Sequence, residues 1–511
     1  MDLLSPAHLL LQPADLLPFR RDRLGVLRFP LPGPPRVLRL GPAREPDRGG
    51  RGFHARPGLG PDGPPGTPAG APGLGPRRGG PGHPGRDRDL PGQAGPGPGR
   101  GGPRVGDLGP GLGRDQHDQL RPAAPLELGL GSRAVPRPGR GDPEPSGRRR
   151  PFLGYINPYV AAGKSLFREA AAKDLLARRA DGSVYLVDFG EFDAGIVDFT
   201  KPEAFAWYKG VIRKNLVEFG LAGWMADFGE YLPTDAVLAD GTPAELAHNE
   251  WPALWARANR EAVDEAGASG EIVYFMRAGW TGSQRWCPMM WAGDQNVDWS
   301  KDDGLPSVIP AALSLAMSGH GLHHSDIGGY TTLFILKRTK ELFQRWAELA
   351  AFTPFMRSHE GNRPGDNWQF DSDEETLRHL ASMTRLHVAL KSYLKDCVRQ
   401  NALRGHPVQR PLFLHFEEDP EAWGIQDQFL LGPDLLAAPV LEEGARKRRL
   451  HLPPGEWADF WSDRVVRSPS PSGTTLEVEA PIGRPPAFFK ASSAWKDVFR
   501  KAADAASGAG R

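Results

Sequence analysis

The stretch TKPEAFAWYKGVIRKNLVEFGLAGWMAD, residues 200–227, decides the fold because it contains one helix and the strand that follows it. Its apolar side chains recur at three- and four-residue steps, the period of one helix face, at Phe205, Tyr208, Ile212, Leu216 and Phe219. Thr200 and Glu203 have the spacing of a capping box, and Gly220 is a helix stop. The apolar run before Asp227 is typical of a buried strand. The stretch therefore predicts a helix that packs on a sheet, followed by a strand of that sheet.

The same alternation of apolar runs and amphipathic helical stretches extends from Phe152 to about Leu403. The predicted strands are Phe152–Tyr159, Gly223–Asp227, Ile272–Arg277, Met289–Gly293, Leu322–Ile327 and Phe352–Met356. Strands that alternate with helices indicate parallel pairing. Polar residues gather where the runs end, which is typical of a (β/α)8 TIM barrel: Asp227, Glu230, Arg277, Asp294, Asp326 and His359. We therefore predict an α/β fold with a (β/α)8 barrel over residues 151–405.

The predicted strands are two short of the eight that close such a barrel. The other two would lie upstream of Phe152, where no convincing strand is found. Beyond the barrel the pattern changes to short β-type runs separated by Pro and Gly: Leu412–Phe416, Leu435–Val440, Arg449–Leu452, Thr475–Val478 and Ala487–Phe489. We expect an all-β C-terminal sandwich over 406–490 and a polar tail over 491–511.

The first 150 residues differ from the rest in composition. They hold 32 of the 63 Gly and 29 of the 52 Pro, but none of the 14 Trp and none of the 8 Tyr. Their 24 basic and 14 acidic residues give a net charge of +10, whereas residues 151–511 hold 39 basic and 48 acidic residues, a net charge of −9. Few large apolar side chains are available to offset the entropy cost of folding, about 1–2 kcal/mol per residue. This composition excludes a packed core for most of the segment.

Three interpretations of this Gly/Pro/Arg-rich segment stay open: a disordered extension, an arginine-rich nucleic-acid arm, and a GC-rich gene translated out of frame. Acidic residues interrupt the arginines and no aromatic interleaving supplies a stacking platform, which disfavours nucleic acid as a partner. The segment contains no Lys, Ile, Asn or Tyr, whose codons are AT-rich, and this favours translation out of frame. Translating the other two frames of the source DNA tests it.

The remaining features of the sequence bear on its location. No run of 18 apolar residues predicts a membrane span, and no basic n-region precedes Leu9–Leu11 as in a secretory signal. Cys287 and Cys397 are the only cysteines and lie far apart in the sequence, so no disulfide framework is expected. We therefore expect a protein of the reducing cytoplasm, with no membrane partner. The oligomeric state stays open.

Two strand-end carboxylates in such a barrel can divide acid–base chemistry, one ionised and the other protonated. Asp227 lies in an apolar and aromatic run, and Asp294 follows Trp291, an aromatic side chain of the kind that stacks on a sugar face. In isolation, an Asp at a strand end is more often a helix cap or a turn former. The residues alone therefore leave both interpretations open.

Four longer motifs carry a resemblance to a known family: GWMADFGEYLP at Gly223–Pro233, WAGDQNVDW at Trp291–Trp299, GHGLHHSDIGGYTT at Gly319–Thr332 and RSHEGNRPG at Arg357–Gly365. Together they look like glycoside hydrolase family 31, a family of retaining α-glycosidases. More closely, residues 152–490 resemble its sulfoquinovosidase branch, whose members release sulfoquinovose from α-glycosides. The segment LGPDLLAAPV, 431–440, resembles the start of the family's C-terminal sandwich.

The resemblance implies a role for each candidate residue. Asp227 would be the nucleophile and Asp294 the general acid/base of a double displacement. Arg277 and His359 match residues that hydrogen-bond sugar hydroxyls, and Tyr330 matches a tyrosine that helps to hold the sulfonate through water. Asp326, in the same pocket, would contact the substrate or support residues that do. The expected partner is a small-molecule glycoside.

No cofactor is expected, because family 31 enzymes need none. His320, His323 and His324 have spacings that invite a metal interpretation, but a zinc pair at i, i+4 requires a helix, and glycines and a strand pattern surround these residues. We therefore predict no metal site.

The resemblance is incomplete in one functional respect. The branch also uses an arginine and, three residues later, a tryptophan near the start of the barrel to bind the sulfonate, and residues 1–150 contain no Trp. Three functions therefore stay open: a sulfoquinovosidase, an α-glucosidase or α-xylosidase of the same family, and a non-catalytic or misfolded product.

Overall fold

The computed structural model describes residues 151–189, 192–287, 289–333 and 335–508. The Gly/Pro/Arg-rich segment, its three interpretations and the two strands sought upstream of Phe152 lie outside these residues.

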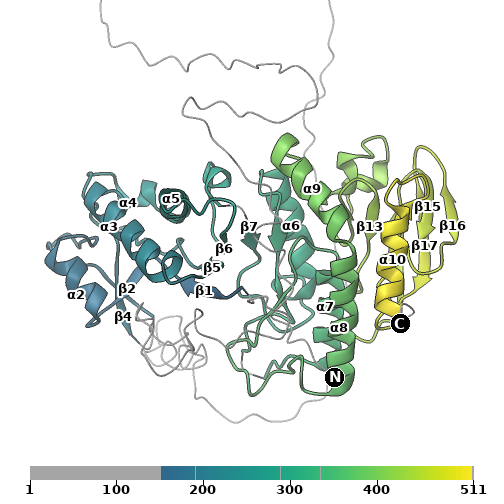
Figure 1. Cartoon of the computed structure of the whole chain (residues 1–511), viewed down its shortest axis with the longest axis horizontal. Coiled ribbons are helices and arrows are strands. Elements are labelled where there is room, and N and C mark those ends of the chain that lie inside the picture. The colour runs from purple at the N-terminus through teal and green to yellow at the C-terminus, as the bar shows by residue number, and fades with distance from the viewer. Residues whose placement is uncertain (1–150, 190–191, 288, 334, 509–511) are drawn as a thin grey trace, which may run out of the picture. The chain divides into compact units, whose positions relative to one another are not determined.

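A parallel sheet forms the centre of the barrel domain, with its strands in the order β1-β5-β6-β7-β8 (Figure 1). Its strands are β1 (Leu153–Ile156), β5 (Gly223–Ala226), β6 (Val273–Met276), β7 (Met289–Trp291) and β8 (His323–His324). A second parallel pair joins β9 (Asp326–Ile327) to β10 (Arg357–Ser358). Every strand pair in this domain's centre is parallel, as the alternation of strands and helices predicts.

The prediction of a strand over Phe352–Met356 is wrong. The amide groups of Phe352 and Thr353 donate to Leu349 O and Ala350 O, so this segment closes the end of the preceding helix. The strand starts one residue after the predicted segment, at Arg357. The apolar run is explained by burial, since Phe352 and Phe355 are both buried.

The register of the sheet decides which side chains meet at its carboxyl end. Tyr155 pairs with Met225, Met225 pairs with Phe275, and paired residues of parallel strands share a face. Two residues further along the same face of β5 and β6 come Asp227 and Arg277. The opposite face of β5 packs on a helix, since Trp224 Nε1 donates to Asn259 Oδ1 at 2.8 Å.

Helices connect and cover the strands: α2 (Ser165–Ala172), α3 (Pro202–Ile212), α4 (Ala244–Ala247), α5 (Trp251–Glu265), α6 (Val308–Met317), α7 (Lys340–Ala350), α8 (Glu374–Ala389) and α9 (Lys391–Arg404), with 3₁₀ turns η4 (Ser283–Arg285) and η5 (Leu305–Ser307). A small antiparallel sheet of order β2-β4-β3 is inserted after β1: β2 (Tyr159–Ala161), β3 (Leu186–Asp188) and β4 (Asp193–Ile196).

The opening helix shows what the sequence pattern predicts and what it misses. The apolar stripe is buried as expected at Phe205, Tyr208 and Ile212, and Gly220 has a positive φ of 95°. The predicted capping box does not form, because the helix begins at Pro202 with Lys201 as its N-cap, and Thr200 Oγ1 instead donates to Asp198 Oδ1 at 2.6 Å. The helix also widens into a π-helix, η3 (Arg213–Val217).

The C-terminal domain is a sandwich of two antiparallel layers. One layer is a six-stranded sheet of order β11-β12-β13-β18-β15-β16, and the other is the pair β14–β17. The strands are β11 (Gln409–Arg410), β12 (Phe429–Leu431), β13 (Leu435–Ala437), β14 (Lys447–Leu452), β15 (Gly455–Asp459), β16 (Val465–Ser468), β17 (Thr474–Glu479) and β18 (Ala487–Lys490). Leu450 and Leu452 of β14 share a buried cluster with Leu436 and Phe488 of the large sheet.

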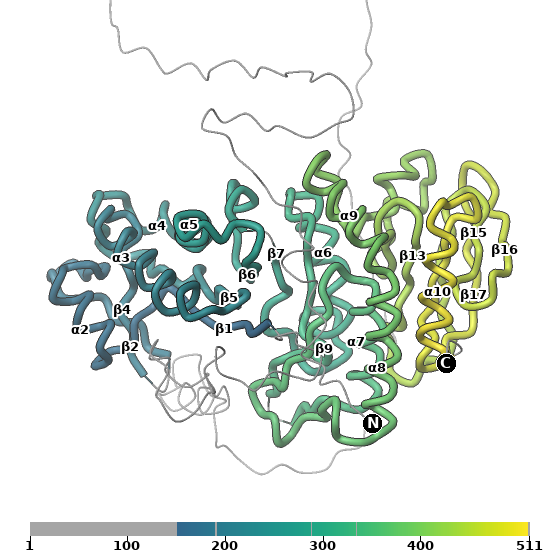
Figure 2. Tube along the Cα trace, in the orientation of Figure 1, coloured from purple at the N-terminus to yellow at the C-terminus, as the bar shows by residue number. Residues whose placement is uncertain are grey.

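Two predictions for this domain are corrected. Leu412–Phe416 is not a strand: it contains the 3₁₀ turn η6 (Leu412–Leu414), and a second turn, η7 (Pro420–Trp423), follows. The predicted polar tail instead contains the helix α10 (Lys496–Ser507), which lies beside α8 (Figure 2). Its apolar face buries Phe499 against Tyr393 of α9, with ring centroids 4.9 Å apart.

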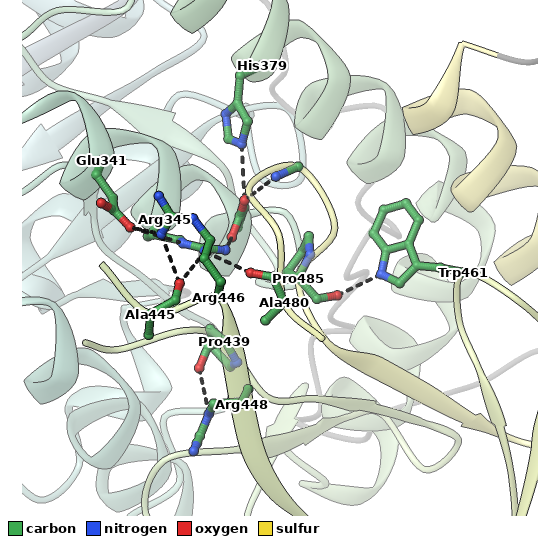
Figure 3. A network of polar contacts seen from close by, with 12 residues as sticks. Glu341, Arg345, His379, Pro439, Ala445, Arg446, Arg448, Trp461, Ala480 and Pro485 are labelled. Carbon is green, nitrogen blue, oxygen red and sulfur yellow. Dashed lines mark hydrogen bonds and ion pairs between the residues drawn. The ribbon is translucent and has the colours of Figure 1, made fainter. Parts of the chain in front are cut away.

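A buried ion pair connects α7 to the C-terminal sandwich (Figure 3). Arg345 and Glu348 have fully buried side chains 2.9 Å apart. Arg345 Nη2 also donates to Ala445 O and Ala480 O, both at 2.8 Å, and Glu348 Oε1 accepts from Gly483 N at 2.6 Å. Backbone groups of the sandwich therefore hydrogen-bond to both members of a charge pair that belongs to the barrel domain.

Replacing Glu348 by glutamine is expected to destabilise the fold by about 3–5 kcal/mol, because the buried Arg345 charge loses its buried carboxylate partner at 2.9 Å. Urea denaturation of the full chain measures this loss. Glu341→Gln is the matched control: Glu341 lies 3.9 Å from Arg345 Nε with its side chain 21% exposed, and losing such a pair costs about 1 kcal/mol or less. Equal losses in the two variants would contradict the role assigned to the buried pair.

Candidate active site

The predicted catalytic carboxylates lie at the carboxyl ends of neighbouring strands. Asp227 directly follows β5, Arg277 directly follows β6, and Asp294 lies three residues after β7. Arg277 contacts both carboxylates: Nη1 is 2.9 Å from Asp294 Oδ2, and Nε is 3.4 Å from Asp227 Oδ1. The structure thus brings Asp227 and Asp294, 67 positions apart in the sequence, to one guanidinium group.

Asp227 is held by donors on both oxygens and is 8% exposed. Its Oδ1 accepts from Phe228 N at 2.8 Å, and its Oδ2 accepts from Tyr155 Oη at 2.6 Å. Phe228 has a φ of 60°, which is an unfavourable backbone conformation for a bulky residue and is typical of functional sites. In addition, Trp255 Nε1 donates to Asp227 O at 3.1 Å. The carboxylate is therefore fixed through its side chain and its main chain.

Arg277 is the electrostatic centre of the site. It forms a second ion pair with Glu230, from Nη2 to Oε1 at 2.7 Å, and lies over the Phe228 ring at 4.2 Å. Burial opposes its charge, but Asp227, Glu230 and Asp294 outweigh that cost and raise the pKa of Arg277. The guanidinium is a permanent cation among three carboxylates.

Asp294 has the properties of a group that exchanges protons near neutral pH. The loss of hydration around Asp294 raises its pKa to about 7. The charge of Arg277 lowers this pKa, whereas the charges of Asp227, Asp326 and Glu230 raise it further. Its side chain is 43% exposed, so a substrate atom can reach it. A pKa near the working pH is what a general acid/base requires.

Tyr330 and His359 form a second part of the site, with ring centroids 5.0 Å apart at 84°. Burial raises the pKa of Tyr330 to about 12, and the charges of Asp294 and Asp227 contribute, so the phenol is within electrostatic reach of both carboxylates. Burial lowers the pKa of His359, which keeps the ring neutral. Because His359 Nδ1 accepts from Gly361 N at 3.0 Å, its proton lies on Nε2, where it can donate to a ligand.

Asp326 belongs to β9 and is 1% exposed. It forms a short ion pair with Arg357, the residue opposite it in the β9–β10 register. Arg357 Nε also donates to His324 Nε2 at 3.3 Å, inside the barrel. From the sequence, Asp326 could either contact the substrate or support residues that do. Its contact with Arg357 favours the supporting role.

Four residues contribute to this site although the sequence predicted no binding or catalytic role for them. Arg357 lies within a quoted motif and Glu230 was noted as a strand-end polar residue, but neither was given a role. Tyr155 lies within a predicted strand and reaches a carboxylate 72 positions away. Arg338 donates to Gly328 O at 3.0 Å and to His359 O at 2.8 Å, and so connects the loops that follow β9 and β10. No local sequence pattern distinguishes Tyr155 or Arg338 from residues of the core.

The histidines considered for a metal point in different directions. His324 faces the barrel interior, with its ring 4.9 Å from Phe275, whereas the adjacent His323 points to the other face of the strand. His320 Nε2 lies 3.3 Å from Ser283 Oγ. Within the described ranges, no group of three or more His, Cys, Asp or Glu side chains is arranged to hold a metal ion.

Comparisons with known proteins place the two domains in one family. A model of the glycosyl hydrolases family 31 TIM-barrel domain matches residues 148–396, and a model of the glycosyl hydrolase family 31 C-terminal domain matches residues 405–494. The predicted barrel followed by an all-β domain is thereby confirmed.

Individual relatives agree with the family models. The chain is 60% identical over 348 residues to the sulfoquinovosidase of Escherichia coli strain K12, and the aligned region covers 68% of this chain and 51% of the relative. It is 51% identical over 352 residues to the sulfoquinovosidase of Agrobacterium fabrum strain C58, covering 68% and 52%.

A solved structure gives the same result. A family 31 sulfoquinovosidase from E. rectale, in complex with an aza-sugar inhibitor, superposes with a TM-score of 0.68 at 50% identity, covering 69% of this chain and 52% of that one. The chain spans about half the length of these relatives. Two family models on adjacent domains and relatives of this identity give one conclusion: the chain belongs to glycosyl hydrolase family 31.

Proposed function

We propose that the chain is a retaining α-glycosidase that releases sulfoquinovose from α-sulfoquinovosides. The observation that carries the proposal is the position of Asp227 and Asp294 on the two sides of one guanidinium, that of Arg277. The two carboxyl groups differ in setting, since Asp227 is buried and bound by donors while Asp294 is half-exposed with a pKa raised to about 7. The relatives' names, sulfoquinovosidase in two organisms, support the choice of substrate.

The geometry supports a double displacement. Protonated Asp294 gives its proton to the glycosidic oxygen while Asp227 attacks the anomeric carbon, which forms a glycosyl ester and releases the aglycone as an alcohol. The ionised Asp294 then takes a proton from water, which attacks the same carbon and frees Asp227. Two inversions at one carbon give retention. Retaining enzymes hold the two carboxyl groups roughly 5–5.5 Å apart.

The remaining candidates bind the sugar in this proposal. His359 donates from Nε2 to a hydroxyl, and Arg277 offers guanidinium protons close to the cleaved bond. Tyr330 extends from the loop after β9 beside His359 and helps to hold the sulfonate through water. Asp326 orients Arg357 against His324 and so supports the residues around them.

We also propose a cytoplasmic enzyme that acts on a small-molecule glycoside. Both cysteines, Cys287 and Cys397, are free and buried, which supports a reducing compartment. In the described part of the chain, no helix has both the length and the apolar character needed to cross a membrane.

Paired assays on nitrophenyl α-sulfoquinovoside and nitrophenyl α-glucoside test the substrate. We expect kcat/KM to favour the sulfoquinovoside by at least about 10³-fold, because a site built for a charged group rejects an analogue that leaves its polar groups unpaired. A preference for the glucoside would identify an α-glucosidase of the same family. No hydrolysis of either substrate by a chain that melts cooperatively would refute the proposed catalysis.

A further inference from the structure

Tyr155 contacts the proposed nucleophile, Asp227, and the double displacement described above does not use it. Its hydroxyl donates to Asp227 Oδ2 at 2.6 Å, from a neighbouring strand on the same face of the sheet. The register explains the contact: Tyr155 pairs with Met225, and Asp227, which directly follows β5, is the next residue on that face. In addition, Asp227 N donates to Ile156 O at 2.8 Å, which holds the end of β5 against β1.

The direction of the Tyr155 proton follows from its other neighbour. Tyr159 N donates to Asn157 Oδ1 at 3.2 Å, so the other amide atom, Asn157 Nδ2, is a donor, and it lies 3.4 Å from Tyr155 Oη. The phenol oxygen accepts from this amide and directs its own proton at Asp227. Burial raises the pKa of Tyr155 well above its usual value, and the charge of Asp227 adds to the effect, so the phenol keeps its proton during the reaction.

We propose that Tyr155 is a further catalytic residue, whose hydrogen bond to Asp227 stabilises the carboxylate as it leaves the sugar in the second half-reaction. The inference rests on the proposed double displacement. In that step water attacks the anomeric carbon, one proton of the water passes to Asp294, and the electron pair of the breaking C–O bond returns to Asp227. Tyr155 remains protonated throughout and only donates a hydrogen bond.

The charge on Asp227 makes this role asymmetric between the two half-reactions. A hydrogen bond to a carboxylate is stronger than one to a neutral ester, so the Tyr155 bond is strong in the free enzyme and weak in the glycosyl-enzyme. Forming the ester therefore gains nothing from Tyr155, whereas breaking it regains the strong bond. The hydroxyl should accelerate deglycosylation selectively.

Tyr155→Phe tests this role, because it removes the hydroxyl and keeps the ring. Nitrophenyl α-sulfoquinovoside is the substrate of choice, because its good leaving group speeds the first step and favours deglycosylation as the slower one. We expect kcat and KM to fall together by about 10- to 100-fold, the range for a hydrogen bond to a charged group. The value of kcat/KM, which reports the first step, should change by less than about threefold. Intact mass spectrometry during turnover should show the glycosyl-enzyme accumulating in the variant.

Tyr159→Phe is the matched control. Tyr159 is also buried in this part of the fold, but among the described residues its hydroxyl forms no hydrogen bond to a carboxylate. Full activity is expected in this variant. If Tyr155→Phe behaves like Tyr159→Phe, or lowers kcat/KM as much as kcat, the proposed role is wrong while the double displacement stands. An inactive wild-type chain would refute the double displacement, and the role of Tyr155 with it.

Discussion

Replacing Asp227 by asparagine is expected to lower kcat by more than about 10⁴-fold, because an amide cannot form the glycosyl ester. The fold should tolerate the change. Asparagine keeps one acceptor for Phe228 N, and its amide nitrogen can donate to the phenol oxygen of Tyr155, which already lies at hydrogen-bond distance. Hydrolysis of nitrophenyl α-sulfoquinovoside and thermal unfolding, measured on the same sample, separate catalysis from stability.

Asp235→Asn is the control for this experiment, since Asp235 is an exposed carboxylate in the same loop after β5 and accepts from Tyr185 Oη at 2.7 Å on the surface. It should retain full activity. Substantial hydrolysis by Asp227→Asn would refute the nucleophile assignment. Equal losses in both variants would indicate a general effect of changing this loop.

Replacing Asp294 by asparagine is expected to remove acid–base catalysis, which contributes about 10²- to 10⁴-fold. The loss should be largest for a substrate with an alkyl aglycone, which needs protonation to leave, and smaller for a nitrophenyl aglycone in the first step. Azide should restore part of the turnover, because this anion attacks the glycosyl-enzyme without a general base. Rates with both aglycones, with and without azide, measure these effects.

The pH dependence of kcat/KM follows from the same carboxyl group. The first step needs protonated Asp294, whose pKa is raised to about 7. Activity should therefore be retained below pH 7 and fall about tenfold per pH unit above it. This basic limb should be missing in Asp294→Asn. A basic limb that stays unchanged in the variant would assign it to another group.

The convergence of Asp227 and Asp294 on one guanidinium group was predictable from the sequence, whereas the contacts that support the two carboxylates were not. Asp227 and Asp294 each end a short apolar run, and in a parallel barrel such positions converge, so their proximity follows from local patterns. The contact of Tyr155 depends on the register between β1 and β5, which no local pattern encodes. Arg338 similarly acts through carbonyl groups of loops that only the folded chain brings together.

The errors at the level of secondary structure have comparable causes. The capping box fails because the helix begins at Pro202, one residue later than a Thr200 N-cap requires, and Thr200 binds Asp198 instead. The helix α10 was missed because its sequence is polar and rich in alanine, and its stability comes from burying Phe499 against α9. The apolar run Phe352–Met356 was mistaken for a strand because burial at a helix end produces the same composition as a buried strand.

The stereochemistry of the first sugar released tests the central claim most directly. Proton NMR spectra recorded during the first minutes of hydrolysis distinguish the two anomers of free sulfoquinovose before they interconvert. Attack by Asp227 followed by water at the same carbon predicts that the α-anomer appears first. Initial release of the β-anomer would show a single displacement by water and would contradict the role of Asp227 as a nucleophile.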